Sequence, residues 1–171
     1  MKILAPLAIA LAILALPTGR ADDVASGAMS AEELKATIAN LGYEVSDIGA
    51  GWQEIRIVHD RSDRTITFNL DLAVSGDSRH VWLVTYVAEL PPLENLAPMP
   101  LAKLLAANDG LRPASFYIHE SEGAAPRLYL SLTLANQGLR PVDLREAIDV
   151  MERSMARSVD LWTDVEWSIE R

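Results

Sequence analysis

The chain of 171 residues is long enough for one domain with its own core, and half of its residues are apolar. It carries 24 acidic and 15 basic residues, a formal net charge of −9, which argues against a nucleic-acid partner because like charges repel. The sequence has no cysteine, so disulfides are excluded and the core alone must stabilise the fold.

Residues 1–21 have the features of a signal peptide. Lys2 gives a charged start, Ile3 to Leu16 form an apolar run, and Gly19 and Ala21 are small residues at positions −3 and −1 of a cleavage site after residue 21. The run is short for a membrane span, which needs roughly 20 helical residues. We therefore expect cleavage, a periplasmic or secreted location and no stable membrane insertion afterwards; an uncleaved anchor is the alternative.

Residues 22–29 are small and polar and predict a flexible lead-in, and residues 30–171 predict a single domain. The domain begins with a helix, because Ser30 and Glu33 have the spacing of a capping box and Gly42 supplies a stop. The apolar residues on one face of this helix are Leu34, Ile38 and Leu41.

Three strands are predicted next, over residues 51–60, 64–74 and 80–90. In the second strand, apolar residues alternate with polar ones at Ile66, Phe68, Leu70 and Leu72, so one face is buried and the other is wet. The third strand is apolar in both registers and is expected at a central position. The connections are too short for a crossover helix, which predicts an antiparallel meander.

Four prolines between residues 91 and 100 predict an irregular crossover to the second half of the chain. Pro100 can begin a short helix that ends at Gly110. Residues at the spacing of one helical face, expected to pack on the sheet, are Leu101, Leu104, Leu105 and Asn108.

A second hairpin is predicted over residues 113–120 and 127–135, with leucines at 128, 130, 132 and 134 facing one way. A long amphipathic helix follows, whose apolar stripe is Leu144, Ile148, Met151, Met155, Val159 and Trp162. On its outer face, Arg145, Asp149 and Arg153 are spaced to form ion pairs. The fold class is therefore α+β, in the order α-β-β-β-α-β-β-α, with a five-stranded antiparallel sheet and helices packed on one face.

This order of elements resembles the YbjN family, whose fold is that of the CesT-like chaperones of type III secretion. The resemblance covers about residues 30 to 162. It is carried by "LLAANDGL", Leu104 to Leu111, and by the tail from Leu128 to Trp162, in which a strand leads through a short link into the last helix.

The resemblance implies a small acidic protein, usually a dimer, that binds or regulates other polypeptides without catalysis and without a cofactor. Only Asn108 matches a family position. Its amide is expected to satisfy backbone groups at the helix end, with ligand contact as the alternative. Chaperones of this kind act in the cytoplasm, whereas the predicted signal peptide indicates export of this chain, so the expectation is an exported binding surface.

Neither a metal site nor a catalytic site is indicated by the sequence. His59, His80 and His119 lie on or beside three different predicted strands, without a partner at ligand spacing. Ser75 and Asp77 in "VSGDSRH" are typical of a polar hairpin turn, and no nucleophile motif or phosphate-binding glycine loop is present.

One group of residues indicates an interface. If the apolar strand positions face the helices, the opposite face of the sheet collects Trp82, Tyr86, Tyr117 and Tyr129, together with Val84, His119, Ser131 and Thr133. Aromatic residues with polar tips are enriched at protein interfaces. The alternative is a solvated face that cross-strand aromatic pairs stabilise.

These observations favour a non-catalytic, exported protein-binding or regulatory module with a protein partner or a second copy as its ligand, a homodimer being the expected form. A carrier of a small molecule or lipid is the alternative, with a cavity between sheet and helices lined by Met151, Met155 and Trp162. An enzyme is the third hypothesis, and no residue set supports it.

Overall fold

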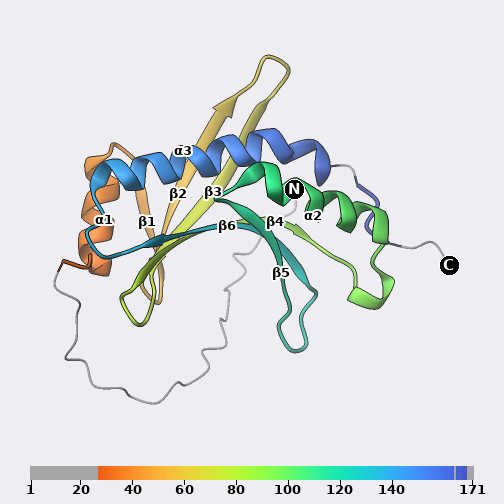
Figure 1. Ribbon diagram of the computed structural model, residues 1–171, viewed down its shortest axis with the longest axis horizontal. Helices are drawn as coiled ribbons and strands as arrows, with labels where there is room; N and C mark the ends of the chain where they lie inside the picture. Colours follow the sequence, from red (N-terminus) through yellow and green to blue (C-terminus); the bar gives the residue numbers. More distant parts are fainter. Residues whose placement is uncertain (1–26, 164, 169–171) are drawn as a thin grey trace, which may run out of the picture.

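The fold is an antiparallel six-stranded sheet with three α-helices on one face, seen in a computed structural model that describes residues 27–163 and 165–168. The strands lie in the order β1-β2-β3-β4-β6-β5 (Figure 1). This confirms the predicted α+β class and the helices on one face. The predicted signal peptide, residues 1–21, lies outside the described residues, as do residues 22–26 of the predicted lead-in.

Helix α1, Ala31–Asn40, begins and ends as its sequence predicts. The Glu33 backbone N–H donates to the Ser30 hydroxyl at 3.2 Å, and the Ser30 N–H donates to the Glu33 carboxylate at 2.8 Å, which completes the capping box. Gly42 follows the helix at φ +95°, a conformation that glycine adopts without steric cost. Leu34 and Ile38 are fully buried, so α1 packs its apolar face into the core.

The predicted meander is confirmed. β2 (Trp52–Asp60) pairs with β3 (Thr65–Val74), which pairs with β4 (His80–Glu89), and β4 lies inside the sheet as expected. The predicted total of five strands is wrong by one, because β1 (Val45–Gly49) adds an edge strand next to β2. Every residue of β1 except the half-buried Val45 is exposed, so its sequence shows no apolar alternation.

The proline-rich crossover contains more regular structure than predicted. A 3₁₀ turn, η1, covers Leu93–Asn95, and helix α2 runs over Pro98–Leu111 and therefore begins two residues before Pro100. The first turn of a helix uses none of its N–H groups for intrahelical bonds, so prolines at positions 98 and 100 cost no hydrogen bond there.

One side chain of α2 faces the other way from the prediction. Leu104 is buried and Leu101 is half-buried, but Leu105 is 61% exposed. The helix lies at the border of the sheet beside β5, and a helix that packs on one side only buries a narrow stripe. That stripe continues to the buried Leu111, about two turns further along α2.

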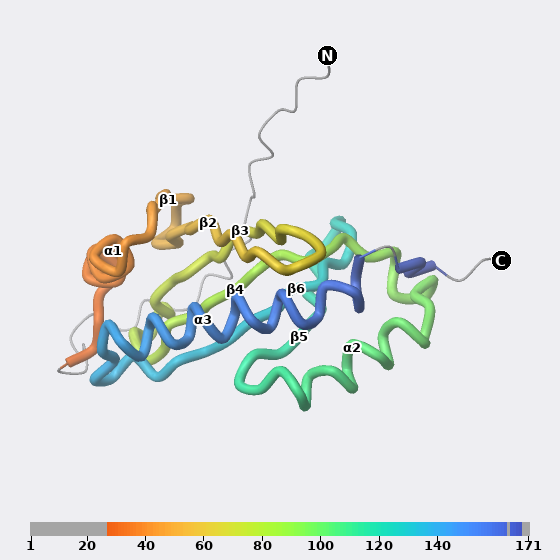
Figure 2. Tube along the Cα trace, turned by 90° about the horizontal axis from the view of Figure 1, so that it is seen from above, coloured from red at the N-terminus to blue at the C-terminus, as the bar shows by residue number. Residues whose placement is uncertain are grey.

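The second half of the chain closes the core. β6 (Arg127–Ala135) pairs with β4 on one side and with the edge strand β5 (Ser115–His119) on the other. Helix α3 (Pro141–Ser158) and the 3₁₀ turn η2 (Val159–Leu161) follow, and α3 crosses the sheet on the same side as α2 (Figure 2).

The predicted apolar positions of β6 and α3 form the centre of the core. Buried residues of these two elements include Leu128, Leu130, Leu132, Leu144, Ile148, Met151 and Met155, whereas Leu134 and Trp162 are half-buried. The predicted ion pairs on the outer face of α3 are absent among the described residues. The Arg145 guanidinium instead donates to the Leu41 carbonyl at 2.8 Å, which joins α3 to the end of α1.

The chain is held against the domain from Gly27 onward. The fully buried Asn136 accepts the Met29 N–H at 3.0 Å, and its amide donates to the carbonyls of Met29 at 2.8 Å and Ser78 at 2.9 Å. Gly27 itself accepts the Gly138 N–H at 3.1 Å. One amide thus ties the segment before α1 to the turn between β3 and β4. No helix in the described part of the chain is long and apolar enough to cross a membrane.

Candidate binding face on the open side of the sheet

The face of the sheet opposite the helices, called the open face here, carries the predicted aromatic residues. Side chains alternate along β4, where Leu83 and Thr85 are buried on the helix side and Trp82 and Tyr86 are 40% and 49% exposed on the other. The same alternation in β5 buries Phe116 and leaves Tyr117 39% exposed. In Figure 2, α2 and α3 lie on the same side of the sheet, and the predicted aromatic residues are on the other side.

Three tyrosines from three neighbouring strands form one group on the open face. Tyr86, Tyr129 and Tyr117 are directly opposite one another on β4, β6 and β5. The Tyr117 and Tyr129 rings stack with centroids 5.4 Å apart, and the Tyr86 ring meets Tyr129 edge-on at 5.9 Å. His119 also meets Tyr129 edge-on, at 6.4 Å. These four residues are called the tyrosine cluster below.

Trp82, the fourth predicted residue, lies in a separate group. Its ring lies 6.2 Å from that of Trp52, and the two strands that carry them flank Ala73 of β3. Ala73 is buried and has a small side chain, which lets the two indoles meet across it. Trp52 was not predicted on this face, although it shares strand parity with the polar residues Glu54 and Arg56.

The phenol groups of Tyr86 and Tyr117 are hydrogen-bond donors at neutral pH. Burial raises the pKa of Tyr117 to about 12, and the neighbouring Tyr129 adds to the shift. The pKa of Tyr86 is also raised, first by burial and then by the Glu89 carboxylate. Uncharged O–H groups on an aromatic surface can donate hydrogen bonds to a partner, and they are poor general bases.

A carboxylate lies beside the aromatic groups. Asp71 of β3 is opposite Val84 on one side and Glu54 on the other, and its Oδ1 atom is buried without a hydrogen-bond partner. Burial raises its pKa to about 6, and the Glu54 carboxylate contributes to the rise. Glu54 is itself bonded by the Asn69 amide at 2.9 Å. The open face therefore contains a charged group that folding leaves incompletely solvated.

The Asp71→Asn variant is expected to be more stable than the parent chain at neutral to alkaline pH. The pKa of Asp71 is about 6 in the folded chain and 3.8 for an ordinary aspartate. The contribution of its protonated carboxyl to stability is therefore present below pH 3.8 and is lost as the pH rises through about 6. Because the carboxyl is only partly buried, we expect a gain of about 1 kcal/mol near pH 8 and almost none near pH 4.

Denaturant unfolding of parent and variant at both pH values measures this difference. Asp109→Asn is the matched control, because the Asp109 side chain is 85% exposed and should change stability little at either pH. A destabilised Asp71→Asn variant near pH 8 would show that the carboxylate has a stabilising partner in solution.

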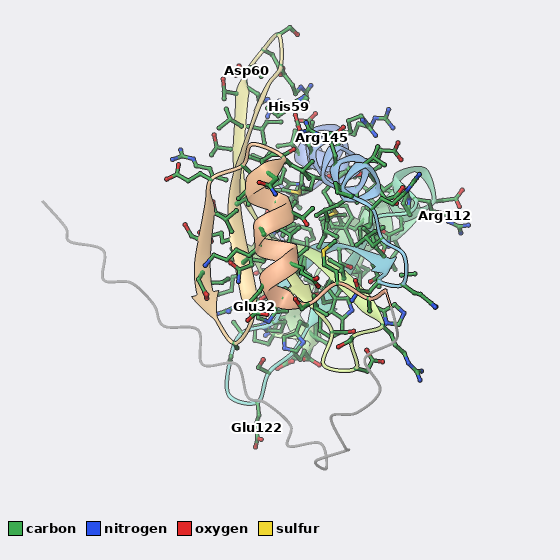
Figure 3. The ribbon with its side chains drawn as sticks, turned by 90° about the vertical axis from the view of Figure 1, so that its left-hand side faces the viewer. Glu32, His59, Asp60, Arg112, Glu122 and Arg145 are labelled. Atoms are coloured by element: carbon green, nitrogen blue, oxygen red, sulfur yellow. The ribbon has the colours of Figure 1, made fainter. Side chains whose placement is uncertain are left out.

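The histidines do not converge. His59 pairs with Glu152 at 2.6 Å and links β2 to α3, whereas His119 bonds Ser121 at 3.0 Å beyond β5. Figure 3 shows His59 on the β2–β3 hairpin, on the far side of the molecule from Arg112. Within the described ranges no group of three or more His, Asp or Glu side chains could hold a metal ion.

The segment "VSGDSRH" is confirmed as a polar hairpin turn. The Ser75 hydroxyl donates to Asp77 at 2.5 Å and accepts the His80 N–H at 3.0 Å, and Asp77 also accepts the Arg79 N–H at 3.1 Å. These bonds are used to close the connection between β3 and β4. The serine and the carboxylate therefore stabilise a turn.

Asn108 satisfies backbone groups, as predicted, and the groups belong to a strand. In the last turns of α2 its Oδ1 atom accepts the Phe116 N–H at 2.7 Å, and its Nδ2 atom donates to the Phe116 carbonyl at 3.2 Å. Both backbone groups lie on β5, whose other edge pairs with β6. The amide thus makes the two hydrogen bonds that a neighbouring strand would make, and it joins α2 to the edge of the sheet.

Asn108→Ala is expected to lower the free energy of unfolding by about 2 kcal/mol, because it leaves the part-buried Phe116 N–H and carbonyl without partners. Chemical denaturation followed by circular dichroism measures the change. Asp109→Ala, at the next position on α2 with an exposed side chain, should cost less than about 0.5 kcal/mol. Equal losses in the two variants would contradict the assigned role of the amide.

The residues predicted to line a ligand cavity belong to the core or pack against it. Met151 and Met155 are buried in the core, and Trp162 packs against it. Two surface hollows, of about 270 Å³ beside α3 and about 320 Å³ beside α1, are both lined by other residues. Neither of these two hollows corresponds to the cavity that the carrier hypothesis places between sheet and helices.

Two solved structures have a similar fold. The first is YbjN from E. coli, a proposed transcription regulator, with 15% sequence identity, a TM-score of 0.55, and a match over 75% of this chain and 90% of that one. The second is a chain of the heterodimeric ExoU–SpcU complex from the type III secretion system of Pseudomonas aeruginosa, with 15% identity, a TM-score of 0.50, and a match over 77% and 99%. At this identity the similarity establishes the fold alone.

No protein-family model matches the sequence, and no curated protein matches it either. The two structural matches confirm the predicted resemblance to YbjN and to type III secretion chaperones at the level of the fold.

Proposed function

We propose that this chain is a non-catalytic module that binds a protein through the open face of its sheet. The observation that carries the proposal is the tyrosine cluster, in which Tyr86, Tyr117 and Tyr129 form ring contacts across three strands while Tyr86 and Tyr117 remain 49% and 39% exposed. Contiguous aromatic surface that no helix covers is typical of an interaction site.

The geometry supports a binding role because the rings are already ordered. Tyr129 contacts Tyr117, Tyr86 and His119, so the cluster loses little side-chain entropy when a partner covers it. Tyrosine and tryptophan are also the residues whose removal most often weakens protein interfaces. The fold shared with a chain of the ExoU–SpcU heterodimer fits a protein ligand.

A non-enzymatic role is part of the proposal. The raised pKa values of Tyr117 and Tyr86 make these phenols poor bases at neutral pH, and Ser75 and Asp77 are used in a turn. Asp71, whose pKa is about 6, has Glu54 and Val84 as its cross-strand neighbours and no nucleophile opposite it. These features give the open face recognition chemistry in place of a reaction centre.

The export of the chain is also a proposal. The charged start, apolar run and small residues of positions 1–21 predict that the exported form begins at Asp22. Mass spectrometry of the N-terminal peptide from the periplasmic and extracellular fractions tests this. Retention of Met1 on the chain in those fractions, or a chain found only in the cytoplasm, would contradict cleavage and export.

Capture from cells tests the function. The full chain with a C-terminal affinity tag is expressed in its own host, purified from the fraction in which it accumulates, and analysed for companion proteins, for its own oligomeric mass and for lipid. A stoichiometric protein partner or a second copy supports the proposal. A chain that purifies as a monomer with bound lipid would favour the carrier hypothesis.

A further inference from the structure

The hollow of about 270 Å³ on the helix side of the molecule lies where α2 ends beside α3. Its apolar wall contains Leu111, which is buried, and Val150, which is half-buried. Its remaining lining includes three arginines, at positions 112, 153 and 157. The residues that line it include no acidic side chain. Figure 3 shows Arg112 at the side of the molecule away from the β2–β3 hairpin.

The positive charge in this hollow is not balanced locally. Arg112 pairs with Asp109 at 3.3 Å, but among the described residues Arg153 and Arg157 have no ion pair or side-chain hydrogen bond. They lie one turn apart on α3, so their guanidinium groups repel each other across one helix face. Both side chains are exposed and therefore accessible to a ligand from solvent.

We propose that this hollow binds the phosphate group of a small phosphate monoester. Guanidinium groups form planar, paired hydrogen bonds with oxyanions, and three of them offer more donors than the two oxygens of a carboxylate can accept. A phosphate monoester has three free oxygens and a charge of about −1.5 to −2 near neutral pH. That charge matches the two arginines that have no acidic partner.

The apolar wall and the volume limit the organic part of the ligand. Leu111 and Val150 can contact a small apolar group next to the phosphate. A volume of about 270 Å³ lies just below the roughly 300–1,000 Å³ of pockets for drug-sized ligands, so the organic group must be small. The hollow is on the helix side, so this site is separate from the open face and does not depend on the proposed function.

Phenyl phosphate is the probe, because it joins a phosphate to a small apolar group. Titration of the full chain, followed by two-dimensional ¹H–¹⁵N NMR against sodium chloride of equal ionic strength, should give saturable shifts at the amides of Gly110 and Ser154, which line the hollow. Inorganic phosphate should shift the same amides with weaker affinity, because it lacks contact with the apolar wall. Benzoate should bind more weakly than phenyl phosphate.

The double variant Arg153→Gln with Arg157→Gln should lower the affinity for phenyl phosphate by roughly tenfold or more. Arg145→Gln is the control, since it removes a positive charge from the same helix outside the hollow, and it should change the affinity by less than about twofold. The spectra themselves report whether each variant is folded.

Three results would overturn the proposal. The first is the absence of saturable shifts at Gly110 and Ser154 in the parent chain. The second is an equal loss of affinity in Arg145→Gln and in the double variant, which would show that the loss comes from the change in net charge and not from the hollow. The third is that benzoate binds as tightly as phenyl phosphate, which would show that the hollow does not select a phosphate group over a carboxylate.

Discussion

Leu132→Asp is expected to unfold the domain. Leu132 is 2% exposed on the helix side of β6, where it lies opposite the fully buried Leu83 of β4. A carboxylate at this position has no partner, and its burial costs several kcal/mol, which is comparable with the whole stability of a typical domain, about 5 to 15 kcal/mol. Circular dichroism should show a loss of the cooperative thermal transition, with the chain unfolded or aggregated at room temperature.

The neighbouring change, Thr133→Asp, is the control. Thr133 is exposed on the open face, opposite Trp82, so the new carboxylate stays in water and should cost less than about 1 kcal/mol. The two residues are adjacent in one strand and differ only in the face they occupy. Similar losses of thermal stability in both variants would contradict the register of β6 against β4.

Tyr117→Ser combined with Tyr129→Ser is expected to weaken association with the protein partner by about 2 kcal/mol or more. The double change removes the stacked pair at the centre of the tyrosine cluster and leaves Tyr86 without its ring contact. Cross-strand aromatic pairs contribute about 1 kcal/mol to stability or less, so the domain should remain folded. The amount of partner that co-purifies with the tagged chain measures association. If the partner is a second copy, light scattering measures the oligomeric mass, and circular dichroism checks that the variant is folded.

A matched change on the helix side separates this effect from a general loss of apolar surface. Met99 and Leu105 on α2 are 67% and 61% exposed, more than either Tyr86 or Tyr117. Met99→Ser with Leu105→Ser should leave association unchanged if the open face is the interface. Full association in the tyrosine variant together with loss in the α2 variant would move the interface to the helix side.

The parts of the fold that the sequence predicts are those with periodic apolar residues. The alternation at Ile66, Phe68, Leu70 and Leu72 predicts β3 and its buried face, since each of these residues packs in the core. By contrast, β1 is short, exposed and paired only with β2, so no apolar pattern marks it. Such a strand forms because its backbone pairs with β2, and its own sequence does not mark it.

Helix α2 shows where periodicity alone is insufficient. The i, i+4 spacing of Leu101 and Leu105 is compatible with one helix face, but the direction that the face takes depends on the helix position relative to β5. The structure turns Leu104 inward and Leu105 outward. The bond between Asn108 and Phe116 contributes to this orientation, and only the role of that amide, not its strand partner, was predicted.

The candidate site was predicted in composition and not in arrangement. Strand parity assigns Trp82, Tyr86, Tyr117 and Tyr129 to one face, and three of them meet in the tyrosine cluster. The contact between Trp52 and Trp82 depends on the register across β3, which the turn at each end of that strand determines. The buried Oδ1 atom of Asp71 depends on the same register and therefore has no signature in the sequence.

The most direct test of binding through the open face is site-specific photo-crosslinking in cells. Benzoylphenylalanine is introduced in place of Tyr117 on the open face, and in a separate chain in place of Met99 on α2, and irradiated samples are analysed for adducts of higher mass. We predict a covalent adduct with another protein or a second copy from position 117 and none from position 99. An adduct from position 99 alone, or none from position 117 while the partner is still captured, would contradict the assignment of the interface to the open face.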